Sequence, residues 1–318
     1  MEENTEQRVD LTLFSEKIQE LKDRIASVIV GQEQTVDLVL TAILANGHVL
    51  IEGVPGVAKT LLARLTARLI DADFSRVQFT PDLMPSDVLG TTVFNMKTNG
   101  FDFHQGPIFA DIVLVDEINR APAKTQAALF EVMEERQISI DGTTHRMGNL
   151  YTILATQNPV EQEGTYKLPE AQLDRFLMKI TMDYPSLEEE VNILERHHTN
   201  AALVKLDDIT PAITKEELLS LRAFMNQVFV DRTLLQYIAL IVQQTRTSKA
   251  VYLGASPRAS VAMLQSSKAY ALLQGRDFVT PEDIKFVAPY VLQHRLILTA
   301  EAEMEGYSPV KVTQRLIC

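Results

Sequence analysis

The stretch Gly53-Val54-Pro55-Gly56-Val57-Ala58-Lys59-Thr60 follows a short apolar run and leads into a helical pattern over 61–70. The order of strand, glycine-rich loop and helix is typical of phosphate-binding loops, in which backbone N–H groups and a helix N-terminus face an anion. Lys59 is then expected to reach the β- and γ-phosphates, and the Thr60 hydroxyl to bind Mg²⁺. The alternative interpretation is an ordinary strand-to-helix turn that is rich in glycine.

The loop departs from the common pattern GxxxxGK[ST] because Ala58 stands where a glycine usually precedes the lysine. The backbone at this position must therefore tolerate a Cβ atom. The candidate nucleotide-binding residues of this region are Gly53, Val54, Pro55, Gly56, Val57, Ala58, Lys59, Thr60 and Leu61.

A second signal is the apolar run Ile112–Val115, which ends in the adjacent carboxylates Asp116 and Glu117. In a parallel sheet, a phosphate-binding loop and the carboxyl ends of neighbouring strands share one crevice. Asp116 is therefore expected to bind Mg²⁺, and Glu117 to polarise the attacking water. The alternative, a solvated strand end, is disfavoured by the phosphate-binding loop upstream.

A third strand pattern, Tyr151–Thr156, is followed by Gln157, Asn158 and a proline that stops the strand. The Asn158 amide is suited to orienting water or the γ-phosphate. An asparagine that caps a turn through its own side chain is the competing interpretation.

Alternating apolar runs and helical patterns predict an α/β fold over residues 1–185, with a mostly parallel five-stranded sheet covered on both faces. The strands are expected at 48–52, 76–80, 111–115, 151–156 and 178–183. The helices are expected at 11–28, 34–46, 60–70, 124–136 and 169–176.

Two inserts, 93–104 with Asn99-Gly100 and 138–147 with Asp141-Gly142, are predicted to be β-hairpins, because these dipeptides favour tight turns. Their tips are candidates for contact with a client protein or with the pore of a ring. Surface hairpins without a function are the alternative.

From about Ser186 the strand signal disappears, and the C-terminal region 186–318 is predicted to be an all-helical lid domain. A capping box begins at Thr214, and a threonine before a proline marks another helix start at Thr280. Helices are expected at 218–228, 233–247, 256–273 and 280–292, and a linker at 200–212.

The composition limits the classes of partner. The 318 residues carry a net charge of −12 with a pI near 5.0, which disfavours nucleic acid as a substrate. The single cysteine, Cys318, closes no intramolecular disulfide, and the acidic, polar residues 1–10 do not resemble a signal peptide. No apolar run is long enough to span a bilayer. We expect a cytoplasmic protein without direct membrane insertion.

The sequence supports ATP and Mg²⁺ as cofactors and no other metal site. The six histidines are scattered, and the adjacent pair His197-His198 would point in different directions on a helix. No HExxH motif or nucleophile elbow is present, so protease chemistry lacks a metal and a nucleophile.

Several motifs occur in a characteristic order. They are Val30-Gly31-Gln32, GVPGVAKT at 53–60, VDEINRAP at 115–122, ATQNP at 155–159, LPEAQLDRF at 168–176 and GASPRA at 254–259. By these motifs, over nearly its whole length, the chain resembles the AAA+ ATPases and, among them, the MoxR family. This family has an alanine at the position of Ala58.

The resemblance implies an ATPase that works as a homo-oligomeric ring, usually a hexamer, with each nucleotide held between neighbouring subunits. It adds Val30 and Gly31 to the nucleotide-binding residues. It makes Arg258 the sensor arginine that the lid offers to the nucleotide, and Arg175 the arginine finger for the neighbour's γ-phosphate. Arg120 is the alternative finger, and a surface ion pair within the subunit is the alternative for both Arg175 and Arg120. For Arg258 the alternative is a structural arginine on a helix surface.

The resemblance also implies chaperone-like remodelling or maturation of partner complexes, often with proteins that carry a von Willebrand factor A domain. Two other functions stay open from the sequence. One is a nucleic-acid-remodelling motor, which the acidity disfavours. The other is a binding module that is switched by nucleotide with little turnover, which the intact pair Asp116-Glu117 disfavours.

Overall fold

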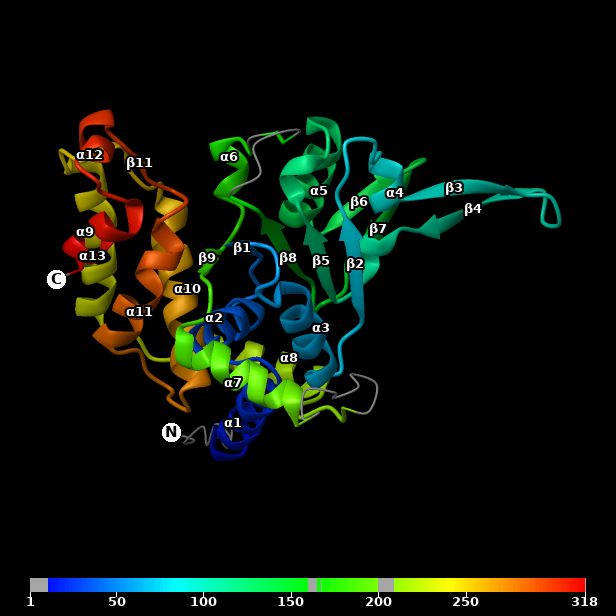
Figure 1. Ribbon diagram of the computed structural model, residues 1–318. Coiled ribbons are helices and arrows are strands. Elements are labelled where there is room, and N and C mark those ends of the chain that lie inside the picture. The colour runs from blue at the N-terminus through cyan, green and yellow to red at the C-terminus, as the bar shows by residue number, and fades with distance from the viewer. Residues whose placement is uncertain (1–10, 160–164, 167, 200–208, 318) are drawn as a thin grey trace, which may run out of the picture.

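The computed structural model describes residues 11–159, 165–166, 168–199 and 209–317. Its centre is a five-stranded sheet in the order β2-β5-β8-β1-β9, with every neighbouring pair parallel (Figure 1). The strands are β1 (Val49–Gly53), β2 (Phe74–Gln78), β5 (Ile112–Asp116), β8 (Thr152–Gln157) and β9 (Met178–Met182). The predicted α/β fold is confirmed, and each predicted strand lies within two residues of the observed one.

Both faces of the sheet are buried, because successive side chains enter two different hydrophobic clusters. Val49 and Ile51 of β1 belong to the cluster with α1, α2 and α3, whereas Leu50 belongs to the cluster with α5. Burial on both faces explains why the strands are continuous apolar runs. These helices are α1 (Leu11–Val28), α2 (Glu33–Leu44), α3 (Lys59–Leu69) and α5 (Ala123–Glu135).

Both predicted hairpins are present. β3 (Gly90–Asn95) and β4 (Gly100–Gln105) follow the short helix α4 (Pro85–Leu89) and project far from the body of the protein (Figure 1). The second hairpin consists of β6 (Gln137–Ile140) and β7 (Thr143–Arg146).

The region after β9 is mainly helical, as predicted. Among the described residues, no helix has the length and apolar character that crossing a membrane requires. The predicted capping box at Thr214 is confirmed, and Thr280, predicted as a helix start, also begins a capping box. The helices are α7 (Leu187–His198), α8 (Lys215–Phe224), α9 (Arg232–Thr247), α10 (Pro257–Leu273), α11 (Pro281–Leu292), α12 (Ala300–Met304) and α13 (Pro309–Leu316).

The sequence did not predict the small antiparallel ladder of β10 (Val251–Leu253) and β11 (Ile297–Leu298) in this helical region. Strands of two and three residues are too short to show an alternating pattern. Another difference is α6 (Glu170–Leu173), which is shorter than the helix predicted at 169–176.

Helix α8 packs against the nucleotide-binding core, although it lies after the predicted boundary. Lys215 Nζ lies 2.6 Å from Asp111 Oδ1, and the Ala212 N–H donates to Leu69 O at 2.8 Å. The division into 1–185 and 186–318 stays a prediction. The predicted linker 200–212 falls largely on residues 200–208, outside the described residues.

Candidate functional site

The phosphate-binding loop joins the end of β1 to the start of α3, as predicted. Ala58 adopts left-handed backbone angles, with φ 60° and ψ 22°, which explains why a glycine is usual at this position. Gly56 also has a positive φ of 91°, and no heavy atom lies within 4 Å of the position that a Cβ would take. The loop is therefore open on the side of Gly56, where an anion can approach its backbone.

Lys59 points back over this loop. Its Nζ donates to Gly53 O at 2.5 Å and to Val54 O at 3.1 Å. Burial lowers the pKa of Lys59, and the nearby Asp116 and Glu117 oppose that shift. The Lys59 ammonium and the two carboxylates therefore attract one another electrostatically across the predicted crevice.

Asp116 ends β5, and its side chain is only 9% exposed. Arg76 Nε donates to Asp116 Oδ2 at 2.6 Å, and Thr156 Oγ1 donates to Asp116 Oδ1 at 3.1 Å. Both partners lie on the strands next to β5, so the sheet itself orients the carboxylate. The sequence analysis missed Arg76 and Thr156, because their proximity arises only from the order of the strands.

Glu117 directly follows β5 with a positive φ of 56°. Gln78, at the end of β2, donates through Nε2 to Glu117 Oε2 at 2.6 Å, and Arg120 lies 3.2 Å from the same oxygen. Gln78 was also missed. Arg120 therefore forms an ion pair with Glu117 of its own chain in this structure.

The strand topology places two further candidates, Asn158 and Val30-Gly31, at the edge of the sheet where the phosphate-binding loop lies. Asn158 follows β8, whose Gln157 pairs with Glu52 of β1. Met182 of β9 pairs with Gly53, so α7 begins beside the loop. Gly31 packs against α7, because a Cβ there would lie 2.3 Å from the Glu189 carboxylate.

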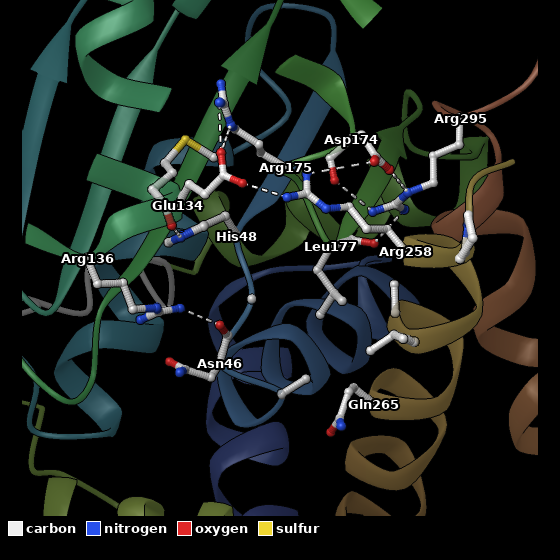
Figure 2. Close-up of a pocket in the computed structure, with 16 residues that line it drawn as sticks. Asn46, His48, Glu134, Arg136, Asp174, Arg175, Leu177, Arg258, Gln265 and Arg295 are labelled. Carbon is white, nitrogen blue, oxygen red and sulfur yellow. Dashed lines mark hydrogen bonds and ion pairs between the residues drawn. The ribbon is translucent and has the colours of Figure 1, made fainter. Parts of the chain in front are cut away.

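Arg175 and Arg258 lie together at the opposite edge of the sheet, where β1 and β9 begin. Both donate to the Glu134 carboxylate, Arg175 Nε at 2.7 Å and a terminal nitrogen of Arg258 at 2.5 Å (Figure 2). Glu134 is one residue from Met133, whose carbonyl oxygen lies 3.1 Å from His48 Nε2. A five-residue strand such as β1 is about 16 Å long. Neither arginine is therefore near the phosphate-binding loop of its own chain.

The two arginines line a groove of about 550 Å³ between the core and the lid helix α10 (Figure 2). Arg136 and Arg295 also line it, so cationic groups dominate its polar wall. Within one subunit Arg258 donates to Glu134, and its role as the sensor arginine stays a prediction. The lid lies over the start of the strands, whereas the phosphate-binding loop follows their end.

The residues present fit a nucleotide with Mg²⁺. The loop offers backbone N–H groups and the N-terminus of α3, and Thr60 and Asp116 offer oxygen atoms of the kind that Mg²⁺ prefers. Mg²⁺ usually binds through one or two carboxylates together with phosphate oxygens and water, so these two side chains are a sufficient protein contribution.

Comparison with known proteins agrees with this geometry. The family described as ATPase family associated with various cellular activities (AAA) matches residues 48–178, and the AAA lid domain matches residues 243–316. The protein YeaC of Bacillus subtilis is 47% identical to this chain over 295 residues, which are 93% of this chain and 91% of that protein.

Two further relatives cover most of the chain. The chaperone MoxR1 of Mycobacterium tuberculosis is 44% identical over 302 residues, which are 92% of this chain and 79% of that protein. The crystal structure of a proposed ATPase from Cytophaga hutchinsonii is 41% identical, with a TM-score of 0.89 over 97% of this chain and 95% of that one. With these similarities and with the phosphate-binding loop and acidic pair in place, the chain belongs to the MoxR family of AAA+ ATPases.

Proposed function

We propose that this protein hydrolyses ATP with Mg²⁺ in a homo-oligomeric ring, a hexamer by analogy with its family, and uses the resulting motion on a client protein. The observation that carries the proposal is the separation of the site into two halves. The loop and the acidic pair lie at one edge of the sheet, and Arg175 and Arg258 lie at the other. A neighbouring subunit can bring the two halves together.

Each residue at the loop edge has a role in this reaction. Lys59 binds the β- and γ-phosphates, and Thr60 and Asp116 hold Mg²⁺, which neutralises charge on the phosphates when it is bound. Glu117 polarises the attacking water, and Asn158 orients it. Val30, Gly31 and Leu61 complete the nucleotide pocket.

The arginines at the opposite edge act on the neighbour's nucleotide. Arg175 is the finger that stabilises charge on the transferred phosphoryl group, a role that contributes about 10³- to 10⁵-fold to turnover in other P-loop enzymes. Arg258 approaches the same phosphate from the lid, because both arginines share Glu134. The contact of Arg120 with Glu117 in its own chain supports Arg175 as the finger.

A protein client is favoured over nucleic acid. The net charge is −12, and the β3–β4 hairpin exposes Met96 and Phe101, which are 88% and 74% exposed. Exposed apolar side chains at the end of a projecting hairpin suit contact with another protein. By analogy with the chaperone MoxR1, the task is chaperone-like maturation of partner complexes. Membership of the MoxR family makes von Willebrand factor A domain proteins in the cytoplasm the expected partners.

The test is ATPase activity per subunit as a function of protein concentration, for the wild type and for Arg175→Ala. Activity per subunit is expected to rise with concentration in the wild type and to stay low in the variant. Constant activity per subunit over a range in which the protein is monomeric would show that each chain hydrolyses ATP alone.

A further inference from the structure

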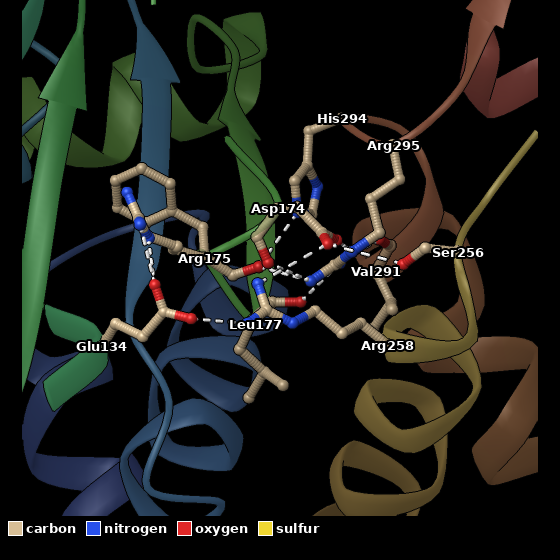
Figure 3. Close-up of polar contacts among 10 residues, drawn as sticks. Glu134, Asp174, Arg175, Leu177, Ser256, Arg258, Val291, His294 and Arg295 are labelled. Atoms are coloured by element: carbon tan, nitrogen blue, oxygen red, sulfur yellow. Dashed lines mark hydrogen bonds and ion pairs between the residues drawn. The ribbon is translucent and has the colours of Figure 1, made fainter. Parts of the chain in front are cut away.

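Three consecutive residues after lid helix α11, Gln293-His294-Arg295, bind the main chain around Arg175. Figure 3 shows His294 and Arg295 beside Asp174 and Leu177. Gln293 Nε2 donates to Lys179 O at 2.5 Å, and His294 Nε2 lies 3.0 Å from Phe176 O. The lid therefore contacts the core through the segment that carries the finger arginine.

Arg295 makes most of these contacts. Its side chain is 4% exposed, and all three guanidinium nitrogens are bonded. Nε donates to Asp174 Oδ1 at 2.6 Å. The terminal nitrogens donate to the carbonyl oxygens of Asp174 at 3.2 Å, Phe176 at 2.7 Å, Leu177 at 3.1 Å and Val291 at 2.5 Å.

These acceptors lie on both sides of Arg175 in the chain. Residues 174–177 form the connection between α6 and β9. Backbone N–H groups of this segment donate locally, Arg175 to Gln172 O and Phe176 to Leu173 O, whereas its carbonyl oxygens accept from Arg295. Arg295 fixes the direction of this segment. A planar guanidinium with a fork of donors can satisfy several carbonyl groups at once, whereas a lysine ammonium cannot match this geometry.

Asp174, which accepts from Arg295, also lies next to Arg258. Asp174 accepts from Arg295 through Oδ1, and its Oδ2 lies 4.0 Å from a terminal nitrogen of Arg258. Arg258 and Arg175 then meet at Glu134. From the lid, Arg295 thus holds the backbone on both sides of Arg175 and a carboxylate that faces Arg258 (Figure 3).

We propose that Arg295 is a positioning residue, which lets the lid set the place of the arginines that serve the neighbouring subunit. This inference rests on the proposed function, in which Arg175 acts on the neighbour's nucleotide. It predicts that loss of Arg295 damages the site of the neighbour and leaves the phosphate-binding loop of the same chain competent.

Mixed assemblies separate these two effects. A mixture of Lys59→Ala and Arg175→Ala subunits contains sites with an intact loop from one variant and intact arginines from the other, so part of the ATPase activity should return. When the Lys59→Ala subunit of this mixture also carries Arg295→Gln, the recovered activity should fall at least about tenfold, because small displacements of a catalytic group are costly.

Two further mixtures are the controls. Lys59→Ala with Arg295→Gln should recover activity, because the Arg295→Gln subunit keeps its loop and receives arginines from its partner. Lys59→Ala/Arg276→Gln with Arg175→Ala should match the first mixture. Arg276 forms an ion pair with Asp283 at 2.5 Å within the lid, so this change weakens the lid without touching residues 174–177.

The outcomes distinguish the two proposals. No recovery in the first mixture would overturn the shared site of the proposed function. The positioning role of Arg295 would be overturned if the first mixture recovers activity and the mixture of Lys59→Ala/Arg295→Gln with Arg175→Ala recovers as much. Failure of the Lys59→Ala and Arg295→Gln mixture would also overturn it, because the damage would then be general. If Arg295→Gln does not fold, Arg295→Lys takes its place with the same expected results.

Discussion

Gln78 Nε2 donates a hydrogen bond to Glu117 Oε2 at 2.6 Å and so joins the end of β2 to the carboxylate that follows β5. The amide donates to one of the two carboxylate oxygens and so competes with a water molecule for it. We predict that Gln78→Ala raises ATP turnover about two- to fivefold at saturating ATP, because the carboxylate is freed to accept a proton from water.

The steady-state ATPase rate tests this prediction. The matched control is Gln78→Ala combined with Glu117→Gln, in which the gain must vanish. A lower rate in Gln78→Ala alone would show instead that Gln78 holds Glu117 in its productive position.

Glu117 and Lys59 should affect different steps. We predict that Glu117→Gln lowers turnover by about 10²- to 10⁴-fold and leaves ATP affinity within about twofold, because the loop stays whole. Lys59→Ala should weaken ATP binding itself. Binding of a fluorescent ATP analogue and the ATPase rate are measured together, with the exposed Glu135→Gln of α5 as the control. Normal turnover in Glu117→Gln would exclude its role in activating water.

Replacing Ala58 by glycine should change the free energy of unfolding in the opposite direction from replacing an alanine within a helix. We predict that Ala58→Gly raises the free energy of unfolding by up to about 1 kcal/mol, because glycine adopts the left-handed conformation without a Cβ penalty. Ala127→Gly, at an exposed position within α5, should lower it by about 1 kcal/mol. Chemical denaturation measures both. The same sign for the two changes would show that Ala58 is not strained.

The parts of the site that the sequence predicted are contiguous in the chain. The loop 53–60 and the pair Asp116-Glu117 each contain their own signal, because strand, turn and polar residue follow one another directly. The strand order was not predictable in this way. The contacts of Gln78 and Thr156 with the acidic pair depend on which strands are neighbours, and no local pattern contains that information.

The place of the lid is the second feature that the sequence could not show. Arg258 was identified from its motif, but its position beside Arg175 depends on contacts between residues far apart in the chain, such as Arg295 with Asp174. Periodicity locates a helix in the sequence and does not locate it against the sheet. The motifs therefore named Arg175 and Arg258 as candidates and left open the edge of the sheet that they occupy.

The buried His48 makes stability depend on pH. Its Nε2 donates to Met133 O at 3.1 Å, and its Nδ1 accepts from the Ile153 N–H at 3.0 Å. Burial, assisted by the positive charge of Arg136, lowers the pKa of His48 from 6.5 to about 3. Below pH 6.5 the unfolded chain therefore binds a proton that the folded chain does not bind. The stabilisation is complete above pH 6.5 and falls as the pH decreases from 6.5 towards 3.

We predict that the free energy of unfolding decreases by about 2 kcal/mol between pH 7.5 and pH 5 through His48 alone, at about 1.4 kcal/mol per pH unit below 6.5. The buried His294, whose pKa is also well below its usual value because of burial, adds to the same trend. His48→Gln, which keeps one donor and one acceptor, should show a shallower slope in denaturation curves measured across this range. The exposed His197→Gln should keep the wild-type slope. An unchanged slope in His48→Gln would mean that His48 binds its proton equally well in both states.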